Sequence, residues 1–280
     1  MYPSGLPHIR ARSVRLPNGI GLRVLESGPP AGRPVVLVHG WGACVYTFRH
    51  TIDALAAAHR VVAFDLRGHG LSDKPSAPNE YETEALLADL VAVLDACALE
   101  QPDLVGHSLG GAIALHFALR YPQRVGRLVL AAPVGLASVP LRRVACLLTP
   151  QFTTRFASAL TPRWLTSFLV RGAYGDPRRV TDDVIDQYWA PSQFPNYYRA
   201  TRGLLHRFDW RALESTELER IGVPTLVILG GADRLIRDAD RGARQIPGAI
   251  IVNLESAGHL GVEEYPEEFN AVLRRFMDSR

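Results

Sequence analysis

Three residues with the chemistry of a nucleophile, an acid and a base occur in the order serine, aspartate, histidine along the sequence. Ser108 stands in the run Gly-His-Ser-Leu-Gly-Gly from 106 to 111, Asp233 follows Gly-Gly-Ala, and His259 follows Ser-Ala-Gly. A serine hydroxyl is a weak nucleophile until a base takes its proton, and a third group must orient that base. We therefore interpret Ser108, His259 and Asp233 as nucleophile, base and orienting acid.

The residues around Ser108 predict the sharp turn that such a nucleophile needs. An apolar run ending at Val105 is typical of a buried strand, and the Ala/Leu-rich stretch 110–121 predicts a helix. A strand that turns directly into a helix strains the central residue and leaves no room for side chains two positions away, hence glycine at 106 and 110. The alternative is a glycine-rich turn in which Ser108 only caps the helix.

Strands and helices alternate along most of the chain. We expect a hairpin over 13–26 and buried strands near 34–38, 60–66, 104–105, 127–133, 224–230 and 249–254. This alternation predicts an α/β fold with a doubly wound, mostly parallel sheet. Parallel strands present their carboxyl ends at one edge of the sheet, and Ser108, Asp233 and His259 each follow one of these strands. We expect the three side chains to meet at that edge.

Between residues 136 and 215 the alternation stops, and helical periodicity takes its place. We therefore predict a core built from 1–135 and 216–280, with an α-helical cap inserted at 136–215. The insertion holds 12 of the 23 aromatic residues, so some of them should line the roof of an apolar pocket. The candidates are Phe152, Phe156, Trp164, Phe168 and Trp189.

Acyl transfer also needs hydrogen-bond donors for the negative charge that develops on the substrate oxygen. The backbone N–H of Leu109, at the expected start of the helix, is one donor. The expected strand 34–38 runs into His-Gly-Trp-Gly, whose glycines would let the backbone N–H of Trp41 approach as the second donor. We expect Leu109 and Trp41 to form the oxyanion hole.

Other polar residues near these glycines are expected to support the loops rather than to react. We assign hydrogen-bonding roles to His39, His69 and His107. We expect Asp65 and Arg67 to tie their loop together as a charged pair.

Together these motifs resemble the α/β-hydrolase superfamily, and more narrowly its small bacterial serine esterases with a helical cap. The resemblance covers roughly residues 34–134 and 220–278, and its motifs are His-Gly-Trp-Gly at 39–42, Asp-x-Arg-Gly-His-Gly-x-Ser at 65–72, the run around Ser108, Gly-x-Asp at 231–233 and Gly-His at 258–259. Haloalkane dehalogenases and epoxide hydrolases of this fold carry aspartate at the position of Ser108. The resemblance therefore argues against those two activities.

Composition and charge exclude several classes of protein. The net charge is +3 without the lysine clusters of a nucleic-acid binder, and no apolar run approaches the roughly 20 residues that span a bilayer. We see no metal-ligand spacing and no signal peptide, and the cysteines, Cys44, Cys97 and Cys146, suit free thiols in a reducing compartment. We expect a cytoplasmic protein without cofactor, metal or integral membrane association. Both a monomer and a homodimer are compatible with the sequence.

The sequence therefore predicts a serine hydrolase of the carboxylesterase type. Its partner would be a small-molecule ester with a small-to-medium apolar acyl group, cleaved through an acyl-enzyme. Two alternatives retain the same residues. One is hydrolysis of a carbon–carbon bond in ring-cleavage products, and the other is a non-catalytic receptor that binds a ligand on this fold.

Overall fold

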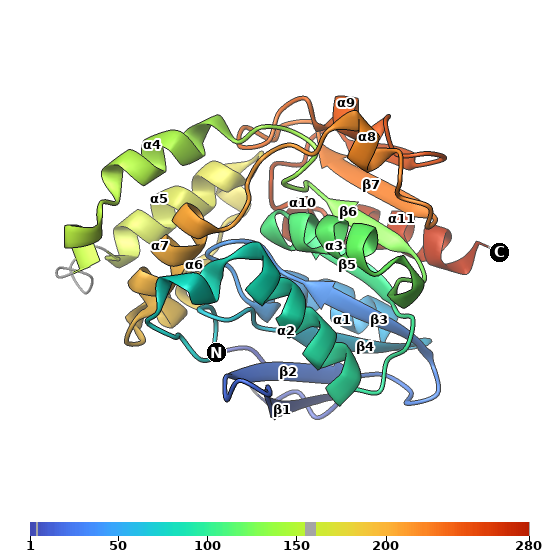
Figure 1. Cartoon of the computed structure of the whole chain (residues 1–280), viewed down its shortest axis with the longest axis horizontal. Helices are drawn as coiled ribbons and strands as arrows, with labels where there is room; N and C mark the ends of the chain where they lie inside the picture. The colour runs from blue at the N-terminus through green and yellow to red at the C-terminus, as the bar shows by residue number, and fades with distance from the viewer. Residues whose placement is uncertain (4, 155–160, 280) are drawn as a thin grey trace.

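One sheet of eight strands runs through the protein (Figure 1). The computed structural model describes residues 1–3, 5–154 and 161–279. The pairs β1–β2 and β2–β4 are antiparallel and the other pairs are parallel, which confirms the predicted mostly parallel sheet with a hairpin at its start. In spatial order the strands are β1 (Ile9–Arg15), β2 (Gly21–Ser27), β4 (His59–Phe64), β3 (Arg33–Val38), β5 (Asp103–His107), β6 (Leu128–Ala131), β7 (Thr225–Gly230) and β8 (Ile250–Leu254).

The central strand β3 is buried on both faces, as its unbroken apolar run predicts. Val35 and Leu37 pack on one face with helices α1 (Arg49–Leu55) and α11 (Pro266–Asp278). Val36 and Val38 pack on the other face with α2 (Thr83–Ala96) and α3 (Leu109–Arg120). Successive side chains of a strand point to opposite faces, so one short run of sequence contributes side chains to both halves of the core.

Shorter elements complete the connections between strands. They are η1 (Val45–Phe48), η2 (Pro78–Tyr81), η3 (Pro122–Arg124), η5 (Pro177–Arg179), η6 (Ala190–Gln193), α8 (Ser215–Leu218), α9 (Ala239–Ala243) and α10 (Gly261–Glu264). None of the described helices has the length and the apolar character needed to cross a membrane.

A helical insertion separates β6 from β7 and lies at one end of the molecule (Figure 1). Its longer helices are α4 (Pro140–Leu148), α5 (Arg163–Ala173), α6 (Asp182–Trp189) and α7 (Tyr197–Arg207), and its described residues contain no strand. Thr181 begins α6 by accepting a hydrogen bond from the backbone N–H of Val184. A third apolar cluster, which includes Tyr46, Tyr174 and Tyr188, joins the insertion to the core. The boundaries at 136 and 215 stay a prediction.

A buried ion pair fixes the loop that follows β4. The guanidinium of Arg67 is fully enclosed, and its Nε donates to a carboxylate oxygen of Asp89 on α2 at 2.5 Å, while Nη1 donates to Glu80. The predicted pair of Asp65 and Arg67 is therefore wrong, because Asp65 lies 3.3 Å from Nη1 of Arg23 on β2 instead. The two side chains turn to different elements, and only the folded chain brings their partners close.

Removing the partner of a buried charge should destabilise the fold strongly. We expect Asp89→Ala to lower the free energy of unfolding by about 3–5 kcal/mol, because the buried charge of Arg67 loses its one fully buried carboxylate partner and keeps only the partly exposed Glu80. Urea denaturation measures this change. The control is Asp95→Ala on the same helix, which removes an exposed pair with Arg124 and should change the free energy by at most about 1 kcal/mol. Similar losses in the two variants would contradict the assignment.

Candidate active site

Ser108 lies in the turn between β5 and α3, at the carboxyl edge of the sheet. Its backbone has φ 54° and ψ −117°, a positive φ that residues with a side chain rarely adopt. The Ser108 N–H donates to the carbonyl of Ala131 at 3.0 Å, and the Ser108 carbonyl accepts from the N–H groups of Gly111 and Val134. These bonds hold the strained residue in place.

The glycines on either side of Ser108 are required by crowding. A Cβ atom at Gly106 would lie 2.3 Å from the carbonyl oxygen of Gly110. A Cβ atom at Gly110 would lie 2.0 Å from the carbonyl oxygen of Val38 on the neighbouring strand. Both distances are far below a van der Waals contact, so the turn admits no larger residue at either position.

The structure brings Ser108, His259 and Asp233 together in one hydrogen-bonded chain. His259 Nε2 lies 2.9 Å from Ser108 Oγ, and His259 Nδ1 lies 2.8 Å from Asp233 Oδ2. A carboxylate only accepts, so Nδ1 carries the proton and Nε2 is left to accept from the serine hydroxyl. Ser108 is 8% exposed and His259 is 7% exposed, so the hydroxyl and the imidazole are largely shielded from bulk water.

Both carboxylate oxygens of Asp233 accept hydrogen bonds, which fix the orientation of the side chain. While Oδ2 faces His259, Oδ1 accepts from the backbone N–H groups of Leu235 at 2.7 Å and Ile236 at 3.1 Å. Burial by itself would raise the pKa of Asp233, but the hydrogen bond and charge of His259 and the two amides outweigh it and lower the pKa. The ionised carboxylate therefore stabilises the folded protein at neutral pH, and this stabilisation is lost as the pH falls through the lowered pKa.

His107 packs against His259, the candidate catalytic base. Its ring lies 5.1 Å from the ring of His259, and its Nε2–H donates to the backbone carbonyl of His259 at 2.8 Å. Burial, followed by the neighbouring His259, lowers the pKa of His107 to about 3, so this ring stays neutral. A neutral ring adds no positive charge beside the base.

The loop after β3 lies against the nucleophile. A Cβ atom at Gly40 would lie 2.9 Å from the Cβ of Ser108, so only glycine lets the backbone come this close. The N–H of Gly42 is already used, since it donates to His69 Nε2 at 3.0 Å. The backbone N–H groups of Trp41 and Leu109, in contrast, donate to no other group in the described ranges. These are the two donors that the sequence predicts for the oxyanion.

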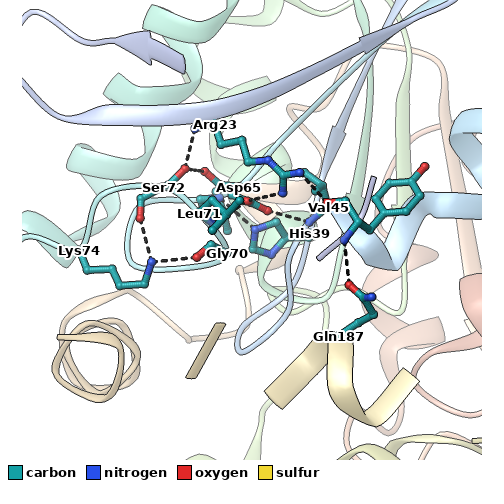
Figure 2. Close-up of polar contacts among 11 residues, drawn as sticks. Arg23, His39, Val45, Asp65, Gly70, Leu71, Ser72, Lys74 and Gln187 are labelled. Carbon is teal, nitrogen blue, oxygen red and sulfur yellow. Dashed lines mark hydrogen bonds and ion pairs between the residues drawn. The ribbon is translucent and has the colours of Figure 1, made fainter. Parts of the chain in front are cut away.

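Buried side chains fix this loop in its position, as Figure 2 shows around Asp65. Asp65 accepts from the backbone N–H of Val45 at 2.8 Å and of Leu71 at 2.9 Å, and so joins the loops after β3 and β4. His39 Nε2 accepts from the N–H of Leu66, which gives this histidine the structural role that the sequence predicts. Burial lowers the pKa of His39, so its ring can accept this bond as a neutral group.

Glu264 connects the loop of His259 to the helical insertion. Its carboxylate is buried and accepts from the backbone N–H of Gly258, directly before His259, at 2.9 Å. The same carboxylate accepts from the N–H groups of Gly175 at 2.9 Å and Asp176 at 2.7 Å, just after α5. One side chain therefore holds two segments that are far apart in sequence.

The neighbouring residue, Glu263, makes a second connection between the same parts. Its carboxylate is buried and lies 2.6 Å from Nη1 of Arg49 on α1. It also accepts hydrogen bonds from the hydroxyl groups of Tyr174 and Tyr188, which belong to the insertion. Neither glutamate is predicted as a functional residue from the sequence. Their only signal is that two adjacent carboxylates follow His259 within a short, mostly apolar stretch.

Three of the aromatic residues predicted to line a pocket are exposed side chains, and the pocket itself stays a prediction. Phe152, Trp164 and Phe168 are among the most exposed large apolar side chains of the chain. Trp189 is half-buried, and its indole N–H donates to the carbonyl of Thr161 at 3.0 Å. Phe156 lies outside the described residues.

Two cavities are lined in part by residues of the hydrogen-bonded chain. A void of about 10 Å³ is lined by His107, His259 and Phe269, among others, and is too small for more than one water molecule. An open depression of about 830 Å³ lies behind Asp233 at the edge formed by β7 and β8. Within the described part of the chain, no group of three His, Cys, Asp or Glu side chains is placed to hold a metal ion.

The sequence signature of the alpha/beta hydrolase fold family matches residues 33–266. This chain belongs to the α/β-hydrolase family. The match includes β3 to β8, the turn at Ser108 and both partners of that serine, so it covers the site and six of the eight strands.

Known relatives extend along almost the whole chain. It is 31% identical to epoxide hydrolase A of Mycobacterium tuberculosis, over 93% of this chain and 95% of that protein. It is 29% identical to a human (lyso)-N-acylphosphatidylethanolamine lipase, over 96% of this chain and 86% of the lipase. Among solved structures, a meta-cleavage product hydrolase from Pseudomonas fluorescens has a TM-score of 0.82 at 24% identity, over 95% and 97% of the two chains, and shows the shared fold. These matches support a hydrolase.

The position of Glu264 predicts that its loss weakens reactivity without unfolding the protein. We expect Glu264→Gln to slow fluorophosphonate labelling of Ser108 about ten- to a hundredfold, because the amide nitrogen must face either the N–H of Asp176 or those of Gly175 and Gly258, and either clash of donors displaces the side chain that holds the loop of His259. Labelling rates are followed by mass spectrometry, with circular dichroism as the check on folding.

The matched control is Glu268→Gln, which changes an exposed glutamate on α11. This variant should label at the wild-type rate. Equal rates for wild type and Glu264→Gln would mean that the carboxylate does not position His259.

Proposed function

We propose that this protein is a serine hydrolase that cleaves carboxylic esters through an acyl-enzyme. The observation that carries the proposal is the unbroken hydrogen-bonded chain from Ser108 through His259 to Asp233. In the first step, Ser108 Oγ attacks the ester carbonyl while Nε2 of His259 takes the hydroxyl proton. Asp233 keeps Nδ1 protonated and stabilises the imidazolium that forms.

The remaining steps use the same groups. The backbone N–H groups of Leu109 and Trp41 would stabilise the negative oxygen of the tetrahedral intermediate. His259 then passes its proton to the leaving alcohol, whose bond to carbon breaks and leaves the acyl group on Ser108. Water, activated by His259, releases the acid and restores the serine.

Two features favour ester cleavage over the activity of the relative named epoxide hydrolase. Residue 108 is serine, whereas the family resemblance implies aspartate at this position in epoxide hydrolases of this fold. The relative named a lipase is nearly as similar to this chain as the epoxide hydrolase. We assign the chain to the carboxylesterase type, with the insertion at 136–215 as a cap and with small-to-medium apolar acyl groups as substrates. The three cysteines are free thiols, which favours a protein that functions in a reducing compartment.

Hydrolysis of carbon–carbon bonds is the second candidate. It would use the same serine and histidine, and the fold is shared with a meta-cleavage product hydrolase. A non-catalytic receptor is the third candidate. The complete proton relay, that is, the hydrogen-bonded chain from Ser108 through His259 to Asp233, argues against it.

Replacement of the nucleophile tests the proposal directly. We expect Ser108→Ala to lower turnover of p-nitrophenyl esters by at least about 10⁴-fold, since no other group can form the acyl-enzyme. Thermal unfolding should show an intact fold. Wild-type turnover in this variant would overturn the mechanism.

A series of p-nitrophenyl esters with rising chain length separates the candidates. Fluorophosphonate labelling of Ser108 together with fast turnover of short and medium esters would support the esterase. Labelling with negligible ester turnover would favour carbon–carbon cleavage, which a vinylogous ring-cleavage dienoate tests next. Tight, thermally stabilising ligand binding without turnover would favour the receptor.

A further inference from the structure

The outer faces of α4 and α5, together with Phe152 in the segment after α4, expose an unusual number of large apolar side chains. Seven of them are between 51% and 81% exposed, and we call this set the α4–α5 surface: Val144, Leu147, Leu148, Phe152, Trp164, Phe168 and Leu169. Single exposed apolar residues are normal on proteins, but a concentration of this kind marks a contact surface.

The exposed residues of α4 lie on one side of the helix, opposite its contacts with the protein. Arg142 and Cys146, one turn apart, both reach the carbonyl of Leu205 on α7 and so define the inner side. Leu147 and Leu148 fall on the other side at the spacing of an α-helix. In Figure 1, α4 is the outermost helix at its end of the molecule.

Helix α5 has the same organisation. Val170 is buried against the cluster that joins the insertion to the core, whereas Trp164 and Phe168, four residues apart, are exposed on the opposite side. Tryptophan, phenylalanine and leucine on one side of a short helix are typical of segments that lie in the interface of a lipid bilayer.

The charge of this part of the chain is entirely positive. Residues 136–175 contain five arginines and no aspartate or glutamate, whereas residues 176–215 contain six arginines and six acidic residues. Arg163 is paired with Asp182 and Asp186 of α6. Within the described ranges Arg142, Arg143 and Arg171 have no carboxylate partner.

We propose that the α4–α5 surface docks this protein onto a membrane surface that carries anionic lipid headgroups. The apolar side chains would enter the interface while Arg143, exposed on α4, contacts phosphate groups. A second copy of the chain is the other obvious occupant, but neither α4 nor α5 carries a carboxylate that could pair with the arginines of that copy. The absence of a membrane-crossing helix among the described residues is compatible with attachment to one face of the bilayer.

Vesicle sedimentation with the full chain tests this proposal. The protein should sediment with vesicles of equal parts phosphatidylcholine and phosphatidylglycerol, and at least about tenfold less with phosphatidylcholine alone. About 0.5 M salt should release most of it, because salt screens the arginine–phosphate attraction.

Two variants and one control assign the binding to this surface. The double variant Leu147→Ser/Leu148→Ser should weaken binding at least about tenfold, and Arg143→Gln about fivefold. Ile250→Ser changes an apolar residue on the edge strand β8 that is 52% exposed, and this variant should bind as wild type does. Circular dichroism and urea denaturation verify that each variant is folded.

Three results would overturn the proposal. They are no sedimentation with either vesicle, equal sedimentation with both, and a homodimer in analytical ultracentrifugation that the double leucine variant converts to a monomer. None of these measurements depends on catalysis, so the outcome is independent of the proposed esterase activity.

Discussion

The close contact between the turn at Ser108 and the neighbouring strand is the constraint on which the site depends. The backbone at Gly110 approaches the carbonyl of Val38 so closely that a methyl group would overlap it. This contact fixes where α3 begins, and the positive φ of Ser108 aims its hydroxyl at the edge where β7 and β8 end. The nucleophile is thus positioned by close packing of the backbone.

Local patterns were sufficient to predict the sheet and the residues that meet at its edge. Unbroken apolar runs mark strands that are buried on both faces, and residues that follow parallel strands are brought together by the topology. For this reason Ser108, Asp233 and His259 could be placed in one site from their positions alone, although His259 is 151 residues from Ser108 and 26 residues from Asp233. The glycines of the turn could be explained in advance because their requirement is steric and local.

Contacts between distant segments could not be predicted in this way. Asp65 and Arg67 were expected to pair because they are neighbours in sequence, yet each turns to a different element. Glu263 and Glu264 bind hydroxyl and amide groups that carry no sequence signal at all. The aromatic residues of the insertion were assigned to a pocket by composition, and composition does not say which side of a helix faces the core. Helix rotation is decided by tertiary packing.

The shared carboxylate of Glu264 has a consequence for the timing of the reaction cycle. Gly258, beside His259, and the segment after α5 depend on the same two oxygen atoms. If α5 swings away from the sheet, the histidine loop loses an anchor in the same movement. Admission of a reactant through such a displacement would weaken the support of His259 at the same time. Reaction at Ser108 would be slowed until α5 returns, so the rate of that return would contribute to the overall velocity.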